Sequence, residues 1–134
     1  MALDMYAEEI VSHYEHPHNA GVMADASASF HNYNASCGDD VTMYLKIEKR
    51  KVVEAKFKGV GCAISMASAS MLTDFVKGKS LKEIEGMNVR TIIGIIGIDP
   101  GPARLKCATL ALRTLKEAVF VYEHKEADKD TKSL

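Results

Sequence analysis

The chain has 134 residues, with 17 basic and 18 acidic side chains and a formal net charge of −1, and this length predicts a single domain over 1–134. A near-neutral chain lacks the basic excess that a nucleic-acid groove or a polybasic membrane anchor requires, so we expect neither nucleic acid nor a membrane as a partner. The acidic N-terminus is unlike a signal peptide, and the apolar stretch 91–98 is too short to cross a bilayer.

The first half of the chain is predicted to form one helix and a small sheet. Apolar residues recur at helical spacing over 3–15, and the Pro and Gly of 16–21 end that pattern. A weak strand follows over 27–34. Alternation of apolar and polar residues then marks two strands, 41–48 and 53–58, which a short charged turn joins into an antiparallel hairpin. The weak strand would add a third strand to this sheet.

The second half is predicted to be helical. Helical periodicity covers 64–76, and Ser80, with a Glu three residues later, opens a short helix through a capping box. A further apolar helix spans 88–98, and Pro102 stands where a long final helix can begin. The charged residues 124–134 are expected to form a disordered tail.

Three cysteines lie at predicted junctions between elements. Cys37 lies in a turn that enters a strand, whereas Cys62 and Cys107 lie at apparent helix starts, where the helix dipole stabilises a thiolate and prepares it to bind metal. Asp39 would complete a four-ligand site. The cysteines are far apart along the chain, which excludes the local Cys-x-x-Cys pair of a zinc finger. On spacing alone, three unrelated core cysteines are the alternative.

Other chemistries find less support. None of the five histidines stands beside a cysteine, so a Cys–His catalytic pair is not indicated, and we interpret His16 and His18 as loop or capping residues. The two glycines in 59–61 precede a helix but lack the remaining residues of a phosphate loop. Unpaired thiols without an export signal favour the reducing cytoplasm.

At these residues the chain resembles the IscU/NifU/SufU family of iron–sulfur cluster assembly proteins. The similarity rests on Ser-Cys-Gly-Asp at 36–39, Phe-Lys-Gly-Val-Gly-Cys-Ala-Ile-Ser at 57–65, Arg-Leu-Lys-Cys at 104–107 and His-Pro-His-Asn-Ala-Gly at 16–21. It extends over 5–119, and the second of these blocks is highly specific. The resemblance implies an α+β fold of the SufE/IscU type, with a three-stranded antiparallel sheet packed by helices.

The resemblance also implies a function, that of a scaffold on which a [2Fe-2S] cluster is built from iron and sulfur and passed on, and not that of a turnover enzyme. The implied ligands are Cys37, Asp39, Cys62 and Cys107, with Asp39 affecting the lability of the cluster. The implied partners are a cysteine desulfurase, an electron donor such as a ferredoxin, and apo iron–sulfur acceptor proteins. A homodimer is considered for the cluster-bound state.

Two departures from the family pattern keep an alternative open. Lys106 stands where a His usually precedes the third cysteine, which resembles the SufU branch, but the insertion typical of SufU between the second and third cysteines is missing. The alternative is a zinc-dependent sulfur acceptor, in which zinc holds the same four residues, and a purely structural zinc protein is a third hypothesis. We expect Cys107, with the adjacent cation of Lys106, to be the main persulfide acceptor.

Overall fold

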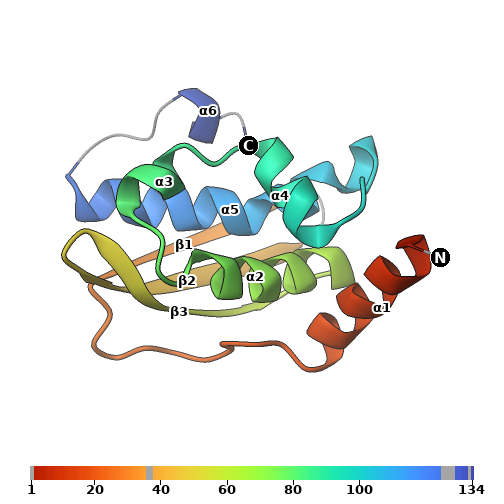
Figure 1. The fold of residues 1–134 in the computed structure, drawn as a ribbon, viewed down its shortest axis with the longest axis horizontal. Coiled ribbons are helices and arrows are strands. Elements are labelled where there is room, and N and C mark those ends of the chain that lie inside the picture. The colour runs from red at the N-terminus through yellow and green to blue at the C-terminus, as the bar shows by residue number, and fades with distance from the viewer. Residues whose placement is uncertain (1, 36–37, 125–128, 133) are drawn as a thin grey trace.

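The computed structural model describes residues 2–35, 38–124, 129–132 and 134. Its centre is an antiparallel sheet in the order β1-β2-β3, and helices cover one face of this sheet (Figure 1). The strands are β1 (Ala28–Asn34), β2 (Asp39–Glu48) and β3 (Lys51–Val60). The helices are α1 (Ala2–Glu15), α2 (Ala63–Val76), α3 (Leu81–Glu85), α4 (Val89–Ile96), α5 (Pro102–Tyr122) and α6 (Lys129–Lys132). The predicted α+β fold with a three-stranded antiparallel sheet is confirmed.

The β2–β3 hairpin follows from the alternation in the sequence. Val41, Met43 and Leu45 are at most 1% exposed, and the residues between them lie on the more accessible face of β2. The turn between the strands places Lys49 at φ 51° and Arg50 at φ 62°. Two successive left-handed residues match the twist of the flanking strands, so this charged tip closes a tight hairpin.

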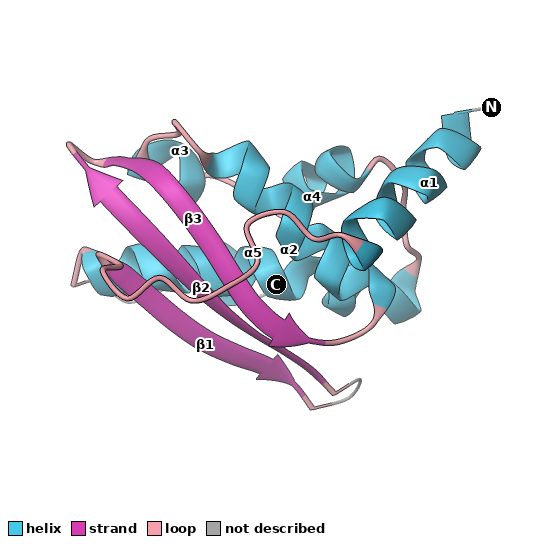
Figure 2. Ribbon diagram, turned by 90° about the horizontal axis from the view of Figure 1, so that it is seen from below, coloured by secondary structure: helices cyan, strands magenta, loops and turns pink. Residues whose placement is uncertain are grey.

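Helices α2 and α5 form the layer over the sheet. Helix α5 packs on β1 and β2, α2 packs on β3, and the two helices contact each other. The main core between these layers includes Met43, Leu72 and Leu115, which are fully buried. Helix α1 packs mainly on α2, beyond the end of the sheet (Figure 2). Because Asp40 pairs with Val60, the start of β2, the end of β3 and the start of α2 lie at one end of the sheet.

Local sequence signals fix several helix ends. Ser80 and Glu83 form the predicted capping box of α3, and Asn88 caps α4 in a similar way. Pro102 begins α5, as predicted. Within the described part of the chain, no helix combines the length and the apolar composition needed to span a membrane.

The C-terminal residues differ from the expected disordered tail where the structure describes them. Lys129–Lys132 form α6, and Thr131 and Leu134 are buried. Leu134 joins the main core and lines a cavity together with Leu110 of α5. Burial of a leucine side chain contributes about 1.5–3 kcal/mol, which holds this end of the chain in place although its composition is charged. Residues 125–128 and 133 lie outside the described residues.

Candidate metal centre

Two thiols and one carboxylate meet near the end of the sheet where β2 and α2 begin. Asp39, Cys62 and Cys107 each offer one ligand atom, and these atoms all lie within 4.8 Å of one another. Asp39 is the first residue of β2, Cys62 is the N-cap of α2, and Cys107 lies within α5. Tertiary folding therefore brings together three of the four residues that the sequence singled out. The fourth, Cys37, lies outside the described residues.

The Asp39 carboxylate is completely buried beside Cys62. Its Oδ1 accepts a hydrogen bond from the backbone N–H of Cys62 at 2.9 Å, and its Oδ2 faces the Cys62 thiol, whose Sγ is 4.0 Å away. A buried carboxylate requires such partners, because burying it without them costs several kcal/mol. One oxygen is thus bound to the backbone, and the other lies beside a thiol.

The glycines before Cys62 allow the backbone of β3 to pack closely against β2, and we assign them no phosphate binding. A Cβ atom on Gly61 would stand 2.5 Å from Oδ1 of Asp39, and one on Gly59 would stand 2.1 Å from the carbonyl oxygen of Asp40. Close-packed interiors do not tolerate such contacts, so both positions require the absence of a side chain. These glycines let β3 approach β2 and let the Asp39 carboxylate reach the N-terminus of α2.

Cys62 caps α2 with its sulfur atom. Its Sγ accepts a hydrogen bond from the backbone N–H of Ser65 at 3.5 Å, and the residue is half-buried. The unpaired N–H groups of a helix N-terminus and the helix dipole both favour an anionic or metal-bound sulfur at this position. The predicted placement of Cys62 at a helix start is confirmed.

Cys107 lies deeper in its helix than predicted. Because α5 begins at Pro102, Cys107 falls in the second turn, and it is only 2% exposed. The dipole effect falls off within the first turn of a helix, so the expected helix-start position of Cys107 is wrong. The apolar stripe of α5 becomes clear only after Cys107, whereas Gly101 and Pro102 begin the helix earlier. Lys106 is exposed, and its modulating role stays a prediction.

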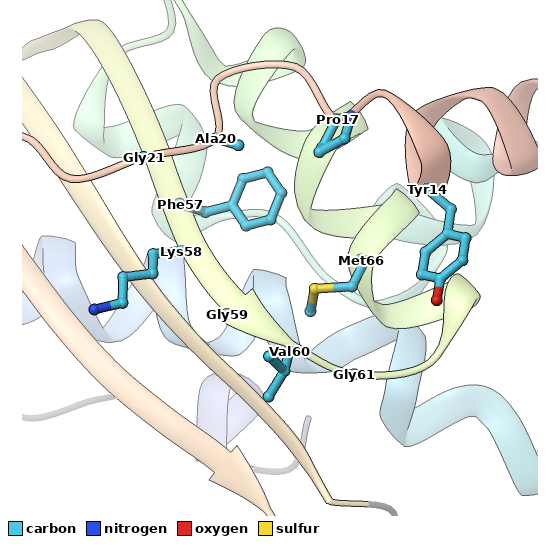
Figure 3. Close-up of a pocket in the computed structure, with 10 residues that line it drawn as sticks. All are labelled: Tyr14, Pro17, Ala20, Gly21, Phe57, Lys58, Gly59, Val60, Gly61 and Met66. Carbon is cyan, nitrogen blue, oxygen red and sulfur yellow. The ribbon is translucent and has the colours of Figure 1, made fainter.

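An apolar groove runs beside this centre. Figure 3 shows Phe57, Val60 and Met66 around the groove, with Tyr14 of α1 on one side and Gly61 where β3 turns toward α2. The groove encloses about 550 Å³, and Val60 is 67% exposed. This groove was not predicted from the sequence. Its one local signal was Val60, a large apolar residue at the end of an alternating strand.

A second group of metal-capable side chains was not predicted, and it includes His18, which we interpreted from the sequence as a loop or capping residue. His13, His18 and Asp74 each offer one ligand atom, and these atoms lie within 4.8 Å of one another. Only the packing of α1 on α2 brings them together, because the first two lie in and just after α1 and the third lies in α2. The periodicity of each helix alone carries no signal of this contact.

The fold and the first site define a protein that presents thiol ligands, the kind that zinc and iron–sulfur clusters prefer, at one end of a small sheet. The chain belongs to the NifU-like N-terminal domain family, whose profile matches residues 5–129. The family resemblance predicted from the sequence motifs is confirmed.

Relatives of two kinds match at similar identity. The chain is 35% identical to the zinc-dependent sulfurtransferase SufU of Bacillus subtilis, with 86% of this chain and 89% of SufU covered. It is 37% identical to the iron–sulfur cluster assembly scaffold protein IscU of Thermotoga maritima, with 86% and 92% covered. A NifU-like N-terminal structure from Brucella abortus has the same fold, with a TM-score of 0.75 at 20% identity over 94% of this chain and 100% of that one.

Proposed function

We propose that this protein is a scaffold on which a [2Fe-2S] cluster is assembled before transfer to acceptor proteins. The observation that carries the proposal is the convergence of Asp39, Cys62 and Cys107, whose ligand atoms lie within 4.8 Å of one another. Thiolates favour iron–sulfur clusters and zinc over hard ions such as magnesium. Cys37, two residues before Asp39 in the sequence, is proposed as the third thiol ligand.

This mixed set of ligands favours a cluster that is bound and later released to an acceptor protein. Aspartate is a harder ligand than thiolate, so iron held partly by Asp39 is bound less firmly than iron held by four cysteines. Oδ1 of Asp39 accepts the Cys62 N–H and Oδ2 faces the Cys62 thiol, so iron bound at Oδ2 would lie beside this thiol. Cys62 is half-buried, so an incoming ligand can approach from its side. The mixed ligands and the accessibility of Cys62 to an incoming ligand thus both support a scaffold.

Assembly on this site depends on partners. Persulfide sulfur has to gain two electrons to become sulfide, so the proposal includes a cysteine desulfurase as the sulfur source and an electron donor such as a ferredoxin. Apo iron–sulfur proteins receive the product, and a homodimer is considered for the loaded state. The residues of this chain bind and orient iron and sulfur, and the proposal assigns them no turnover of their own.

The identity of the persulfide acceptor stays a prediction. Cys107 keeps the adjacent Lys106, but its place in the second turn of α5 removes the helix-start argument for it, and its burial limits access by a sulfur donor. Cys62 combines partial exposure with a position at the helix N-cap, where a thiolate is favoured.

A zinc-dependent sulfur acceptor is the second candidate function. The observation that favours it is the 35% identity to SufU of Bacillus subtilis, together with Lys106 in place of a histidine. In this candidate the same residues hold zinc, because three thiolates and one carboxylate also make a suitable tetrahedral zinc site. The two candidate functions therefore use the same ligand residues and differ in what these residues bind, a [2Fe-2S] cluster or a zinc ion.

Metal and sulfide analysis separates the two candidates. The metal-free chain is incubated anaerobically with a cysteine desulfurase, cysteine, ferrous iron and a reductant. We expect matching amounts of iron and sulfide and the visible absorption of a [2Fe-2S] cluster. Asp40→Ala, which changes the partly exposed carboxylate next to Asp39, should behave like the parent, and Cys62→Ser should not. Tight zinc binding without uptake of iron and sulfide would contradict the scaffold proposal and support the zinc-dependent candidate.

A further inference from the structure

A second metal-capable cluster lies where α1 and the loop after it meet α2. His13, His18 and Asp74 present two imidazole nitrogens and one carboxylate oxygen within 4.8 Å of one another. The two imidazole rings are 4.4 Å apart between centroids. Because a helix rises about 1.5 Å per residue, Asp74 lies about 18 Å along α2 from Cys62. The cluster is therefore too far from the thiol centre to share a metal ion with it.

Ser70 contacts the ring of His13 and the backbone of His18. Nδ1 of His13 is 2.6 Å from Oγ of Ser70, and the same hydroxyl oxygen accepts the backbone N–H of His18 at 2.7 Å. When Nδ1–H of His13 donates to Ser70, Nε2 of that ring carries the lone pair that a metal requires. Metal-binding histidines are held in this way by a hydrogen bond from the other ring nitrogen.

Asn19 holds the carboxylate of Asp74. Nδ2 of Asn19 donates to Oδ1 of Asp74 at 2.8 Å and to Oγ1 of Thr73 at 3.0 Å, while Oδ2 of Asp74 is 2.5 Å from Nδ1 of His18. Three residues of α2, Ser70, Thr73 and Asp74, thus fix the segment that follows α1. Ser70 and Asn19, which are not proposed ligands, thus position His13 and Asp74, as residues around metal sites do, and Asp74 in turn holds the ring of His18.

The charge states of the cluster suit a cation. Burial, and then the nearby His18, lower the pKa of His13 below 6.5, which keeps this imidazole neutral at pH 7. Burial raises the pKa of Asp74, but hydrogen bonds from His18 and Asn19 outweigh it and hold the pKa below 3.8, so this carboxylate is an anion at pH 7. A neutral imidazole and an ionised carboxylate are the forms that bind metal.

We propose that His13, His18 and Asp74 bind one divalent transition-metal ion of the zinc class, and that this ion ties α1 to α2. Two imidazoles and one carboxylate are a zinc-type donor set, whereas magnesium and calcium prefer oxygen ligands. The side chains of His18 and Asp74 are 54% and 44% exposed, so water can complete a fourth position. Since α1 packs mainly on α2, an ion at this contact stabilises the docked position of the whole helix.

The test uses a tag-free chain with Cys37→Ser, Cys62→Ser and Cys107→Ser combined, so that zinc binding reports on this cluster alone. We expect calorimetric titration with zinc to give one equivalent, a higher Tm, and slower amide exchange in α1. Binding of cobalt should give ligand-field absorption without sulfur-to-cobalt charge transfer. Adding His18→Asn to the thiol-free chain should abolish the binding of this zinc equivalent. Adding Ser70→Ala should lower the affinity for zinc by about 10–100-fold.

The matched control is His31→Asn. His31 also pairs with an aspartate, since its Nε2 lies 3.0 Å from Asp40 Oδ1, but these two residues belong to neither metal-capable group of described residues. Zinc binding should be unchanged in this variant. If the thiol-free chain loses its circular dichroism spectrum, the intact chain serves instead, with two zinc equivalents falling to one in His18→Asn. Less than one equivalent in the thiol-free chain, or unchanged binding in His18→Asn, would overturn the proposal and leave a hydrogen-bonded cluster only.

Discussion

The two ends of α2 carry groups of potential ligands that differ in burial and in chemistry. At the N-terminal end, Asp39 is fully buried and the other ligands are thiols. Toward the C-terminal end, His18 and Asp74 are about half exposed and the donors are nitrogen and oxygen. The first group depends on close backbone packing, and the second depends on side-chain hydrogen bonds between α1 and α2. Substitutions at the N-terminal end of α2 should therefore change cluster binding, and substitutions toward its C-terminal end should change the docking of α1.

The largest expected effect is the loss of the cluster in Cys62→Ser. A serine hydroxyl is nearly isosteric with a thiol but is a poor ligand for iron in a cluster. Cys37→Ser and Cys107→Ser should have the same effect, and circular dichroism should show that the fold persists. His18→Asn, at the other end of α2, should keep the iron and sulfide content of the parent. Normal iron and sulfide in any cysteine variant would remove that cysteine from the site.

The next effect concerns the accessibility of the two described thiols. In the metal-free chain, Cys62 should be alkylated by iodoacetamide faster than Cys107, because Cys62 is half-buried at an N-cap and Cys107 is 2% exposed. Mass spectrometry of peptides at successive times measures both rates in one sample. Equal alkylation rates for the two thiols would mean that the start of α5 opens readily. Cys107 would then be accessible enough to accept a persulfide.

Asp39→Ala should slow the loss of a bound cluster several-fold. The substitution removes a hard ligand and with it a route by which water displaces iron. The decay of visible absorption under identical anaerobic conditions measures this change, with Asp40→Ala as the control because Asp40 pairs with His31 on the other face of β2. A cluster that decays faster in Asp39→Ala than in the parent would contradict the lability argument.

Gly61→Ala should destabilise the fold by about 1–3 kcal/mol, because overpacking of this size forces neighbouring atoms to move. The new Cβ would stand 2.5 Å from Oδ1 of Asp39. Gly94→Ala is the matched control, since a Cβ there meets nothing within 4 Å and lies in α4, where alanine gains about 0.5–1 kcal/mol. Urea unfolding measures both variants. Adding Asp39→Ala should relieve part of the cost of Gly61→Ala, and simple additivity of the two changes would show that the Asp39 carboxylate is not the obstacle.

The parts of the fold that local sequence determines were predictable. The alternation in β2 and β3, the capping box at Ser80 and the first turn of α5 at Pro102 each depend on residues close together in the chain. The buried Leu134 was not predictable from a charged tail, because the residues that line a cavity with it lie far away in the chain, in β1 and α5.

The site was predictable in its residues and not in its geometry. Motifs identified Asp39, Cys62 and Cys107, but the hydrogen bond from the Cys62 N–H to Asp39 and the depth of Cys107 depend on how this end of the sheet and α5 pack. The cluster of His13, His18 and Asp74 had no sequence signal, since it depends on how α1 and the loop after it pack on α2. The single-domain boundary over 1–134 and the role of Cys37 stay predictions.

Transfer of a cluster to an acceptor tests the central claim most directly. The chain is loaded with a [2Fe-2S] cluster anaerobically and mixed with an apo-ferredoxin in the presence of an iron chelator that traps released ions. Circular dichroism in the visible range follows the cluster from one protein to the other. The scaffold proposal predicts transfer to the ferredoxin that is faster than reconstitution from free iron and sulfide, and slower when the donor is Asp39→Ala. A loaded chain whose cluster reaches the chelator and not the ferredoxin would contradict it.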